Sequence, residues 1–174
     1  MKLSEATDLI HDPDITGAGK KVWADLGCGT GLFSQALALL IPAGSKIFAV
    51  DTNRAALNRI TPSKRVTIET LNADFSKDPL QMSGLDGILM ANSLHFIQDK
   101  PSFISKLDKL LGGEGSFLIV EYNTDEPNPW VPFPISFKEL VDLFLRLGYQ
   151  VIRKINELPS RYDHATIYSA LIKK

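Results

Sequence analysis

The chain has 174 residues, 44% of them hydrophobic and 22% charged, with a formal net charge of −1. These values predict a single globular domain, residues 1–174, that buries a sizeable core. They disfavour a nucleic-acid partner, because nucleic-acid-binding domains usually carry a strongly basic balance.

The cysteine count and the apolar runs set further limits. The single cysteine, Cys28, excludes an intrachain disulfide and a cysteine-built zinc site. The first residues lack a signal-peptide core, and the longest apolar run, 36–42, is too short to cross a bilayer. We therefore expect no membrane segment and a reducing, cytoplasmic setting, and the sequence leaves a homo-oligomer open.

The first forty residues predict a helix, a strand and a second helix. Residues 3–10 favour a short helix with Ser4 as its cap. Pro13 then breaks this helix, because the residue before a proline avoids helical geometry. A strand is expected over 21–26. The helix expected over 32–40 is apolar on nearly every side, so it should pack against a sheet.

A glycine-rich stretch joins that strand to the second helix, Asp25-Leu-Gly-Cys-Gly-Thr-Gly31. Its alternating glycines let the backbone turn sharply and approach a ligand without a Cβ in the way. The following helix points free N–H groups and the positive end of its dipole at the same crevice. We expect a ligand-binding loop here, with a plain tight turn as the alternative.

The middle of the chain alternates strands and helices. Asn53 is expected to cap a short helix through Ile60, and Asp99 a helix that ends at Gly112 and Gly113. Four strands are expected over 46–50, 66–71, 87–91 and 116–121.

The last part of the chain predicts an ordered loop, a helix and two strands. Segment 122–135 contains four prolines together with Trp130 and Phe133, which is a poor composition for a disordered linker. A Ser-x-x-Glu capping box at 136–139 starts a helix that Gly148 ends. The strands expected over 149–155 and 165–172 are too close together for a crossover helix, so they should be antiparallel.

This order of elements predicts an α/β fold. We expect a Rossmann-like three-layer sandwich with a seven-stranded, mostly parallel sheet that ends in an antiparallel hairpin. Ligands on such sheets bind beyond the carboxyl ends of the strands, where the strand order reverses. Polar residues gather at these strand ends: Asp25 to Gly31, Asp51, Asp74, Asn92 and Tyr122.

Several of these residues suit an adenosine-containing ligand. Asp51 could accept two hydrogen bonds from a ribose diol, or it is a solvated aspartate. Asp74 and Phe75 could border an adenine, or they are a turn aspartate and a core phenylalanine. Asp25 needs a partner if buried, either a cationic ligand group or a backbone N–H. Cys28 is interpreted as a small turn residue.

Together these motifs resemble the class I S-adenosylmethionine-dependent methyltransferases, of the small-molecule type 11/25 kind. The resemblance covers nearly the whole chain and rests on the glycine motif, Asp51, Ala73-Asp74-Phe75 and Asn92-Ser-Leu-His-Phe96. It implies S-adenosylmethionine as cofactor, direct displacement of the methyl group, and a sheet whose sixth and seventh strands exchange places. The implied cofactor-binding residues are Asp25, Gly27, Cys28, Gly29, Gly31, Asp51, Thr52, Asp74, Phe75, Asn92 and Ser93.

The resemblance also bears on the acceptor. The motif of amino-group nucleic-acid methylases is absent, and the residues around His95 most resemble the small-molecule branch, so we expect a small-molecule substrate. Many such relatives have a long amino-terminal lid, whereas only about 20 residues precede the first expected strand here. The pocket is then open, closed by segment 123–135, or completed by a partner chain.

Candidate catalytic and substrate residues follow from residue chemistry. His95 could act as a base if the acceptor must lose a proton, or it is a structural histidine. Tyr122 could orient the acceptor or contact the sulfonium, or it belongs to the core. No metal-ligand spacing is present. Candidate substrate contacts, with packing or surface positions as the alternative, are Trp130 and Phe133 for an apolar group and Arg161 and Tyr162 for an anionic one.

Two rival functions remain open. A nicotinamide-dependent oxidoreductase would need glycine at position 32, which is Leu32, and a Tyr-x-x-x-Lys pair, which is absent. A non-catalytic module that binds the cofactor and works through a partner is supported by the missing lid.

Overall fold

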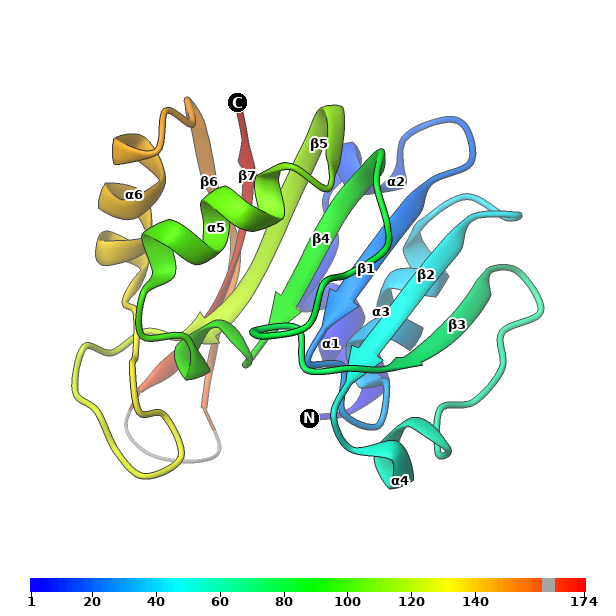
Figure 1. Cartoon of the computed structure of the whole chain (residues 1–174), viewed down its shortest axis with the longest axis horizontal. Coiled ribbons are helices and arrows are strands. Elements are labelled where there is room, and N and C mark those ends of the chain that lie inside the picture. The colour runs from blue at the N-terminus through cyan, green and yellow to red at the C-terminus, as the bar shows by residue number, and fades with distance from the viewer. Residues whose placement is uncertain (161–164) are drawn as a thin grey trace.

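A seven-stranded sheet forms the middle layer of the computed structural model, which describes residues 1–160 and 165–174. The strand order is β3-β2-β1-β4-β5-β7-β6 (Figure 1). The first five strands are parallel, and β7 runs antiparallel to both β5 and β6. The strands are β1 (Val22–Leu26), β2 (Lys46–Asp51), β3 (Thr67–Asn72), β4 (Leu85–Ala91), β5 (Leu111–Tyr122), β6 (Val151–Pro159) and β7 (Thr166–Lys173).

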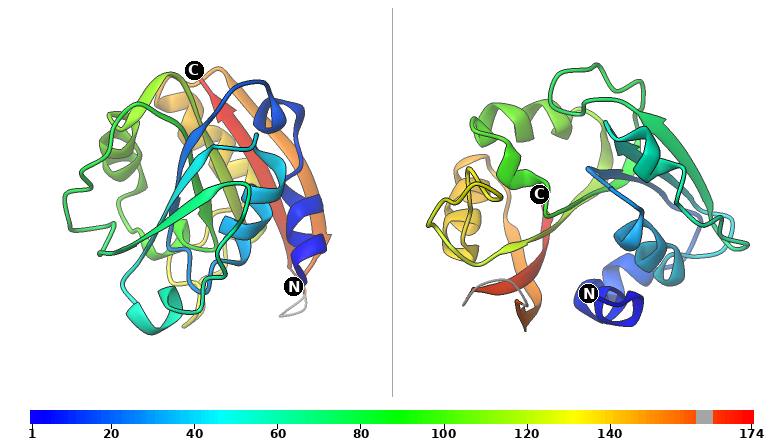
Figure 2. Two further views of the ribbon diagram at one scale, coloured as in Figure 1. Left: turned by 90° about the vertical axis from the view of Figure 1, so that its right-hand side faces the viewer. Right: turned by 90° about the horizontal axis from the view of Figure 1, so that it is seen from below.

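Helices cover both faces of this sheet (Figure 2). Helices α5 and α6 lie on one face, and α1 and α3 lie on the other, so the predicted three-layer α/β sandwich is confirmed. The helices are α1 (Leu3–Ile10), α2 (Pro13–Thr16), α3 (Leu32–Leu40), α4 (Arg54–Leu57), α5 (Lys100–Asp108), α6 (Phe137–Arg146) and the single 3₁₀ turn η1 (Leu94–Phe96).

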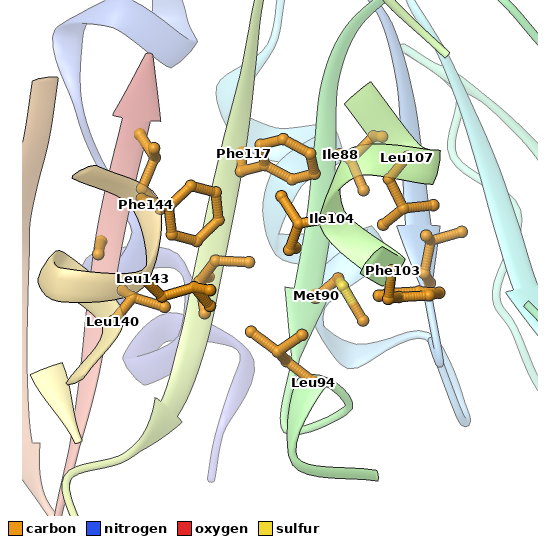
Figure 3. Packing of buried hydrophobic residues seen from close by; sticks show 14 of the residues in the cluster. Ile88, Met90, Leu94, Phe103, Ile104, Leu107, Phe117, Leu140, Leu143 and Phe144 are labelled. Carbon is orange, nitrogen blue, oxygen red and sulfur yellow. The ribbon is translucent and has the colours of Figure 1, made fainter. Parts of the chain in front are cut away.

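The core forms two large clusters, one on each face of the sheet, and a small third cluster of Cys28, Ala49 and Leu57. In β5, Phe117 packs toward α5 and α6, whereas the next residue, Leu118, packs toward α1 and α3. This alternation follows from the two-residue period of a strand, and it explains why a doubly covered strand is apolar at every position. Figure 3 shows Phe117 beside Ile104 and Phe144. Complete burial of each such side chain stabilises the fold by about 1.5–3 kcal/mol.

The strand ends define where a ligand would bind. The carboxyl ends of β1, β2, β4 and β5 lie along one edge of the sheet, the lower edge in Figure 1. The strand order reverses between β1 and β4, which are neighbours in the sheet. Crevices form at such reversals because the connections on the two sides leave in opposite directions.

Some local predictions are wrong at element ends. Helix α1 begins at Leu3 with Lys2 in the cap position, so Ser4 lies inside the helix. Helix α5 ends at Asp108, and the glycines expected to end it belong to β5. The reason is tertiary, because Leu111 already pairs with Leu85 of β4. Helix α4 is a single turn that ends at Leu57.

Candidate functional site

The glycine loop after β1 is held by the end of β2. The backbone N–H groups of Gly27 and Cys28 both donate to the carbonyl oxygen of Val50, at 2.8 and 3.1 Å. Gly27 has a φ of +80°, and a Cβ there would lie 2.6 Å from the Cβ of Ser93. The fold itself therefore requires glycine at position 27. Burial raises the pKa of the Cys28 thiol, which suits the predicted small turn residue rather than a nucleophile.

Gly29 is different, because its neighbourhood is open. Its φ is +54°, yet a Cβ at this position would have no atom within 4 Å. Its N–H donates to Oδ2 of Asp51 at 2.8 Å. Backbone that is exposed on the side where a Cβ would stand allows a ligand to approach closely.

Asp51 ends β2 with its carboxylate fixed by backbone groups. Its Oδ2 accepts from Gly29, and its Oδ1 accepts from the N–H of Asn53 at 2.8 Å. The amide of Asn72 donates to the carbonyl oxygens of Asp51 and Thr52, at 3.0 and 2.8 Å, and so holds the turn. Each carboxylate oxygen keeps a further lone pair, so Asp51 retains the acceptor capacity that the expected ribose contact needs.

Asp25 is a buried acid with one unsatisfied oxygen. It is 1% exposed, and its Oδ2 accepts from the Ser34 hydroxyl at 2.5 Å. Its Oδ1 has no hydrogen-bond partner among the described residues. Burial raises the pKa of Asp25 to about 7, opposed by the Ser34 hydrogen bond and reinforced by the charge of Asp51. A cationic ligand group would satisfy this oxygen and stabilise the ionised form.

Asn92 and Ser93 close the site from β4. The Ser93 hydroxyl donates to the carbonyl oxygen of Leu26 at 2.6 Å, which fixes the end of β4 against β1. Asn92 adopts a left-handed backbone conformation with φ of 54°, and its buried Oδ1 also lacks a partner among the described residues. Left-handed backbone is uncommon outside glycine, so this turn holds its side chain in a constrained position.

Asp74 and Phe75 follow β3, on the adenine side of the expected site. The ring of Phe75 approaches the glycine loop, where a Cβ on Gly27 would lie 3.2 Å from its Cε1. The Asp74 carboxylate instead serves its own turn. It accepts from the N–H and hydroxyl of Ser76 and pairs with Lys77 at 2.9 Å. These hydrogen bonds from Ser76 and Lys77 lower the pKa of Asp74 to about 2.

A buried histidine–glutamate pair joins η1, which follows β4, to the last residues of β5. His95 is 3% exposed and Glu121 1%, and Nδ1 of the imidazole lies 2.7 Å from Oε2 of the carboxylate. Oε1 of the same carboxylate accepts from the backbone N–H of His95 at 3.1 Å. Sequence reasoning missed Glu121. The available signal was an acidic residue at the carboxyl end of an otherwise apolar strand.

Two cavities meet at this end of the sheet and share Asn92 and Tyr122. The smaller cavity, about 460 Å³, is lined by residues of α1, the start of α3, the end of β6 and the start of β7, together with Asn92 and Tyr122. The larger cavity, about 790 Å³, is lined by Asn92, His95, Tyr122, Thr124, Asn128, Trp130, Val131 and Ala165. Five of its eight lining positions come from β5 and the segment that follows it, so segment 123–135 forms a wall of this cavity.

The predicted substrate residues separate in the structure. Trp130 lines the larger cavity and is 83% exposed. Phe133 is not among the lining residues, and its backbone N–H donates to the carbonyl oxygen of His95 at 3.0 Å. Arg161 and Tyr162 lie outside the described residues. Within residues 1–160 and 165–174, no group of three potential metal ligands comes together, and no helix has the length and hydropathy to cross a membrane.

Residues 24–119 match a protein family described as "Methyltransferase domain". Over 107 residues the chain is 32% identical to Uncharacterized methyltransferase Rv0089 of Mycobacterium tuberculosis, with 61% of this chain and 53% of that protein covered. It is 34% identical to a cypemycin N-terminal methyltransferase of a Streptomyces species, with 53% and 42% covered. The chain thus spans about half the length of the curated relatives it matches.

Solved structures show the same fold. The 1,6-didemethyltoxoflavin-N1-methyltransferase of Burkholderia thailandensis, crystallised with 1,6-didemethyltoxoflavin and S-adenosylhomocysteine, has a TM-score of 0.73 at 18% identity. The alignment covers 99% of this chain and 77% of that one. A SAM-dependent methyltransferase from Aquifex aeolicus has a TM-score of 0.61 at 20% identity, with 99% of both chains covered. Because the family match spans more than half of this sequence, the predicted resemblance is confirmed, and the chain belongs to the methyltransferase domain family.

Proposed function

We propose that the protein binds S-adenosylmethionine where β1, β2 and β4 end and transfers its methyl group to a small-molecule acceptor. The observation that carries the proposal is Asp25, a buried carboxyl group whose Oδ1 has no partner among the described residues. It lies at the end of the strand that leads into the glycine loop. An α-amino group of the cofactor would supply both the missing hydrogen bond and the compensating charge.

The surrounding residues fit the rest of the cofactor. The open side of Gly29 leaves space for the ligand, and Asp51 offers carboxylate lone pairs to the ribose. Phe75 offers an aromatic face beside the adenine. The assignments of Thr52, Asp74 and the remaining positions named from the resemblance stay part of this proposal.

The chemistry requires little from the protein beyond position. When bound, the cofactor supplies a methyl group that is already activated on a sulfonium. The residues of this chain then orient the two reactants and exclude water, and such alignment is worth about 7–11 kcal/mol in favourable cases. Asn92 follows β4, one of the strands at whose ends the cofactor would bind, and it also lines the larger cavity, so donor and acceptor would meet near this residue.

We place the acceptor in the larger cavity. Its volume of about 790 Å³ suits a small organic molecule, and its lining combines aromatic, amide and imidazole groups. The Burkholderia structure, which was crystallised with 1,6-didemethyltoxoflavin, supports a small-molecule acceptor. A reducing, cytoplasmic setting is supported by Cys28, the one cysteine of the sequence, whose thiol is free and buried.

Calorimetric titration of the full chain with S-adenosylmethionine and S-adenosylhomocysteine tests the proposal. We expect saturable binding with one site per chain, and a folded protein that binds neither compound would refute it. Release of S-adenosylhomocysteine on addition of acceptors separates an enzyme from a non-catalytic binding module. The family match gives no support to a nicotinamide-dependent oxidoreductase.

A further inference from the structure

We propose that Glu121 positions His95 so that Nε2 of the imidazole accepts a proton from the acceptor bound in the larger cavity. The acceptor is then an N–H or O–H nucleophile that loses its proton during methylation. This inference rests on the proposed function. His95 would be the catalytic residue, and Glu121 the positioning residue that acts through it.

The first support is that one carboxylate holds His95 at two points. Oε2 of Glu121 contacts Nδ1 of the ring at 2.7 Å, and Oε1 accepts from the backbone N–H of the same residue at 3.1 Å. An ionised carboxylate can only accept hydrogen bonds, so Nδ1 must carry a proton. In a neutral imidazole, the remaining nitrogen, Nε2, then has a free lone pair and is the basic site.

The second support is the position of the His95 side chain. His95 lines the larger cavity together with Tyr122, Thr124 and Asn128. Among the described residues, the ring nitrogens of His95 have one hydrogen-bond partner, Glu121, which contacts Nδ1. A merely structural histidine at 3% exposure would be expected to satisfy both nitrogens. Here the unsatisfied nitrogen belongs to a side chain that forms part of a cavity wall.

Charged and titratable groups on neighbouring elements complete the environment. Lys100 of α5 is buried, which lowers its pKa, while the charge of Glu121 raises it. Its Nζ donates to the carbonyl oxygens of Ile97 and Phe133, at 2.9 and 2.7 Å. From β7, Tyr168 has its pKa raised by burial and by the charges of Glu121 and Asp125.

Two aromatic rings lie near the His95 ring. The ring of Tyr122 lies 6.3 Å from the His95 ring between centroids, and that of Phe96 lies 4.4 Å away. Tyr122 also lines the larger cavity, so the pair lies next to an aromatic wall of that cavity. His95 and Glu121 are themselves buried, and the low polarity around them strengthens their hydrogen bonds.

The proton balance of the step is simple. The N–H or O–H bond of the acceptor breaks, and its proton forms a new N–H bond at Nε2 of His95. The electron pair left on the acceptor atom forms the bond to the methyl carbon, and the former carbon–sulfur pair remains on the sulfur of the neutral thioether product. His95 is now an imidazolium paired with the Glu121 carboxylate, and it returns the proton to water after product release.

The geometry can be tested without any acceptor. Long-range ¹H–¹⁵N correlation spectra of the full chain at pH 8 report which nitrogen of each imidazole carries the proton. We expect His95 to be protonated at Nδ1 and bare at Nε2. We also expect diethyl pyrocarbonate to modify His95, located by peptide mass spectrometry. A proton on Nε2, or an unmodified His95 when the exposed His11 has fully reacted, would overturn the inference.

The catalytic role is tested with variants and a panel of N–H and O–H acceptors. His95→Gln should lower kcat by about 10²–10⁴-fold, the usual range for general-base catalysis, with the Kd for S-adenosylmethionine unchanged. Glu121→Gln, which keeps the shape but removes the charge, should lower kcat at least tenfold. Added imidazole should restore turnover in His95→Ala, a rescue that a structural role does not predict.

Matched controls are His11→Gln and Glu114→Gln, which change an exposed histidine and an exposed glutamate of β5. Both should retain wild-type kcat. Normal turnover by a folded His95→Gln variant would refute this inference and leave the proposed function standing. The same holds if the wild-type protein binds S-adenosylmethionine but methylates no N–H or O–H acceptor. Failure to bind S-adenosylmethionine would remove the proposed function as well.

Discussion

Oδ2 of Asp51 accepts a hydrogen bond from the backbone N–H of Gly29 at 2.8 Å, which ties the end of β2 to the loop that follows β1. The two residues are 22 positions apart in the sequence. Of the three glycines in this loop, Gly29 is the one with open space where a Cβ would stand. The contact fixes the Asp51 carboxylate beside it. A ligand at this loop would therefore meet an acceptor that is already oriented.

Asp51→Ala should weaken S-adenosylmethionine binding by more than about 1 kcal/mol, because a charge-assisted hydrogen bond is lost. Calorimetry measures the change in Kd directly. Glu69→Ala is the matched control, since Glu69 is an exposed carboxylate on β3 that pairs with Lys46. An unchanged Kd for the Asp51 variant would exclude Asp51 from the cofactor site.

The variants Gly29→Ala and Gly27→Ala should distinguish a glycine that leaves room for the ligand from a glycine that the fold requires. A Cβ at Gly27 would collide with Ser93, so this variant should lose several kcal/mol of stability or fail to fold. At Gly29 the new methyl group meets nothing, and the left-handed backbone costs about 1–2 kcal/mol. We expect Gly29→Ala to fold with a modestly lower Tm but to lose S-adenosylmethionine binding. Wild-type affinity in that variant would mean that no ligand approaches the loop there.

The stability of the ligand-free protein should fall as pH rises from 5 to 8. The pKa of Asp25 is about 7 in the folded chain, against 3.8 for an ordinary aspartate. Between these values the unfolded chain binds fewer protons than the folded one, so raising the pH favours unfolding, by about 2.5 kcal/mol over this window.

Urea unfolding at several pH values measures this slope, and Asp25→Asn should flatten it. Asp74 and Glu157 have pKa values lowered to about 2, so their stabilising contributions are lost only as the pH falls through that acidic range. The titration of these two groups therefore does not contribute to the change in stability between pH 5 and 8. A wild-type slope that rises with pH would contradict the burial of an unpaired Asp25.

Signals that act within one helical turn were predictable from the sequence. Asn53, Asp99 and Ser136 cap helices as expected, each accepting from a backbone N–H three residues later. The alternation of strands and helices was likewise readable, because each pattern has its own hydrophobic period. The place of β7 between β5 and β6 followed from the family resemblance rather than from any local pattern.

What could not be predicted depends on distant partners. The carboxylate of Glu121 bonds His95, 26 residues away, and Lys100 bonds Phe133, 33 residues away. No local spacing relates these pairs. Gly87 shows the same limit inside the core, since a Cβ there would lie 2.4 Å from the ring of Trp23 on the neighbouring strand. The short helix α2, capped by Asp12, was also missed.

Lys100→Met should destabilise the fold by about 2 kcal/mol, because one buried and one part-buried carbonyl group lose their donor. The ammonium group bonds the carbonyl oxygens of Ile97 and Phe133, which joins η1 to the segment that walls the larger cavity. Urea unfolding gives the stability change, and limited proteolysis should show faster cleavage within 123–135. Lys106→Met, an exposed change on the same helix, should show neither effect. Equal stability of the two variants would contradict the anchoring role.

Trp130 provides a fluorescent report of the larger cavity. The sequence has two tryptophans, and they differ sharply in exposure, with Trp23 at 2% and Trp130 at 83%. Iodide should therefore quench mainly Trp130, and Trp130→Phe should remove most of the quenching while changing stability by no more than about 0.5 kcal/mol. A compound that the protein methylates should protect Trp130 from iodide when it binds. Turnover of a compound that leaves the quenching unchanged would show that the acceptor binds elsewhere, because an occupied cavity must cover part of the indole that lines it.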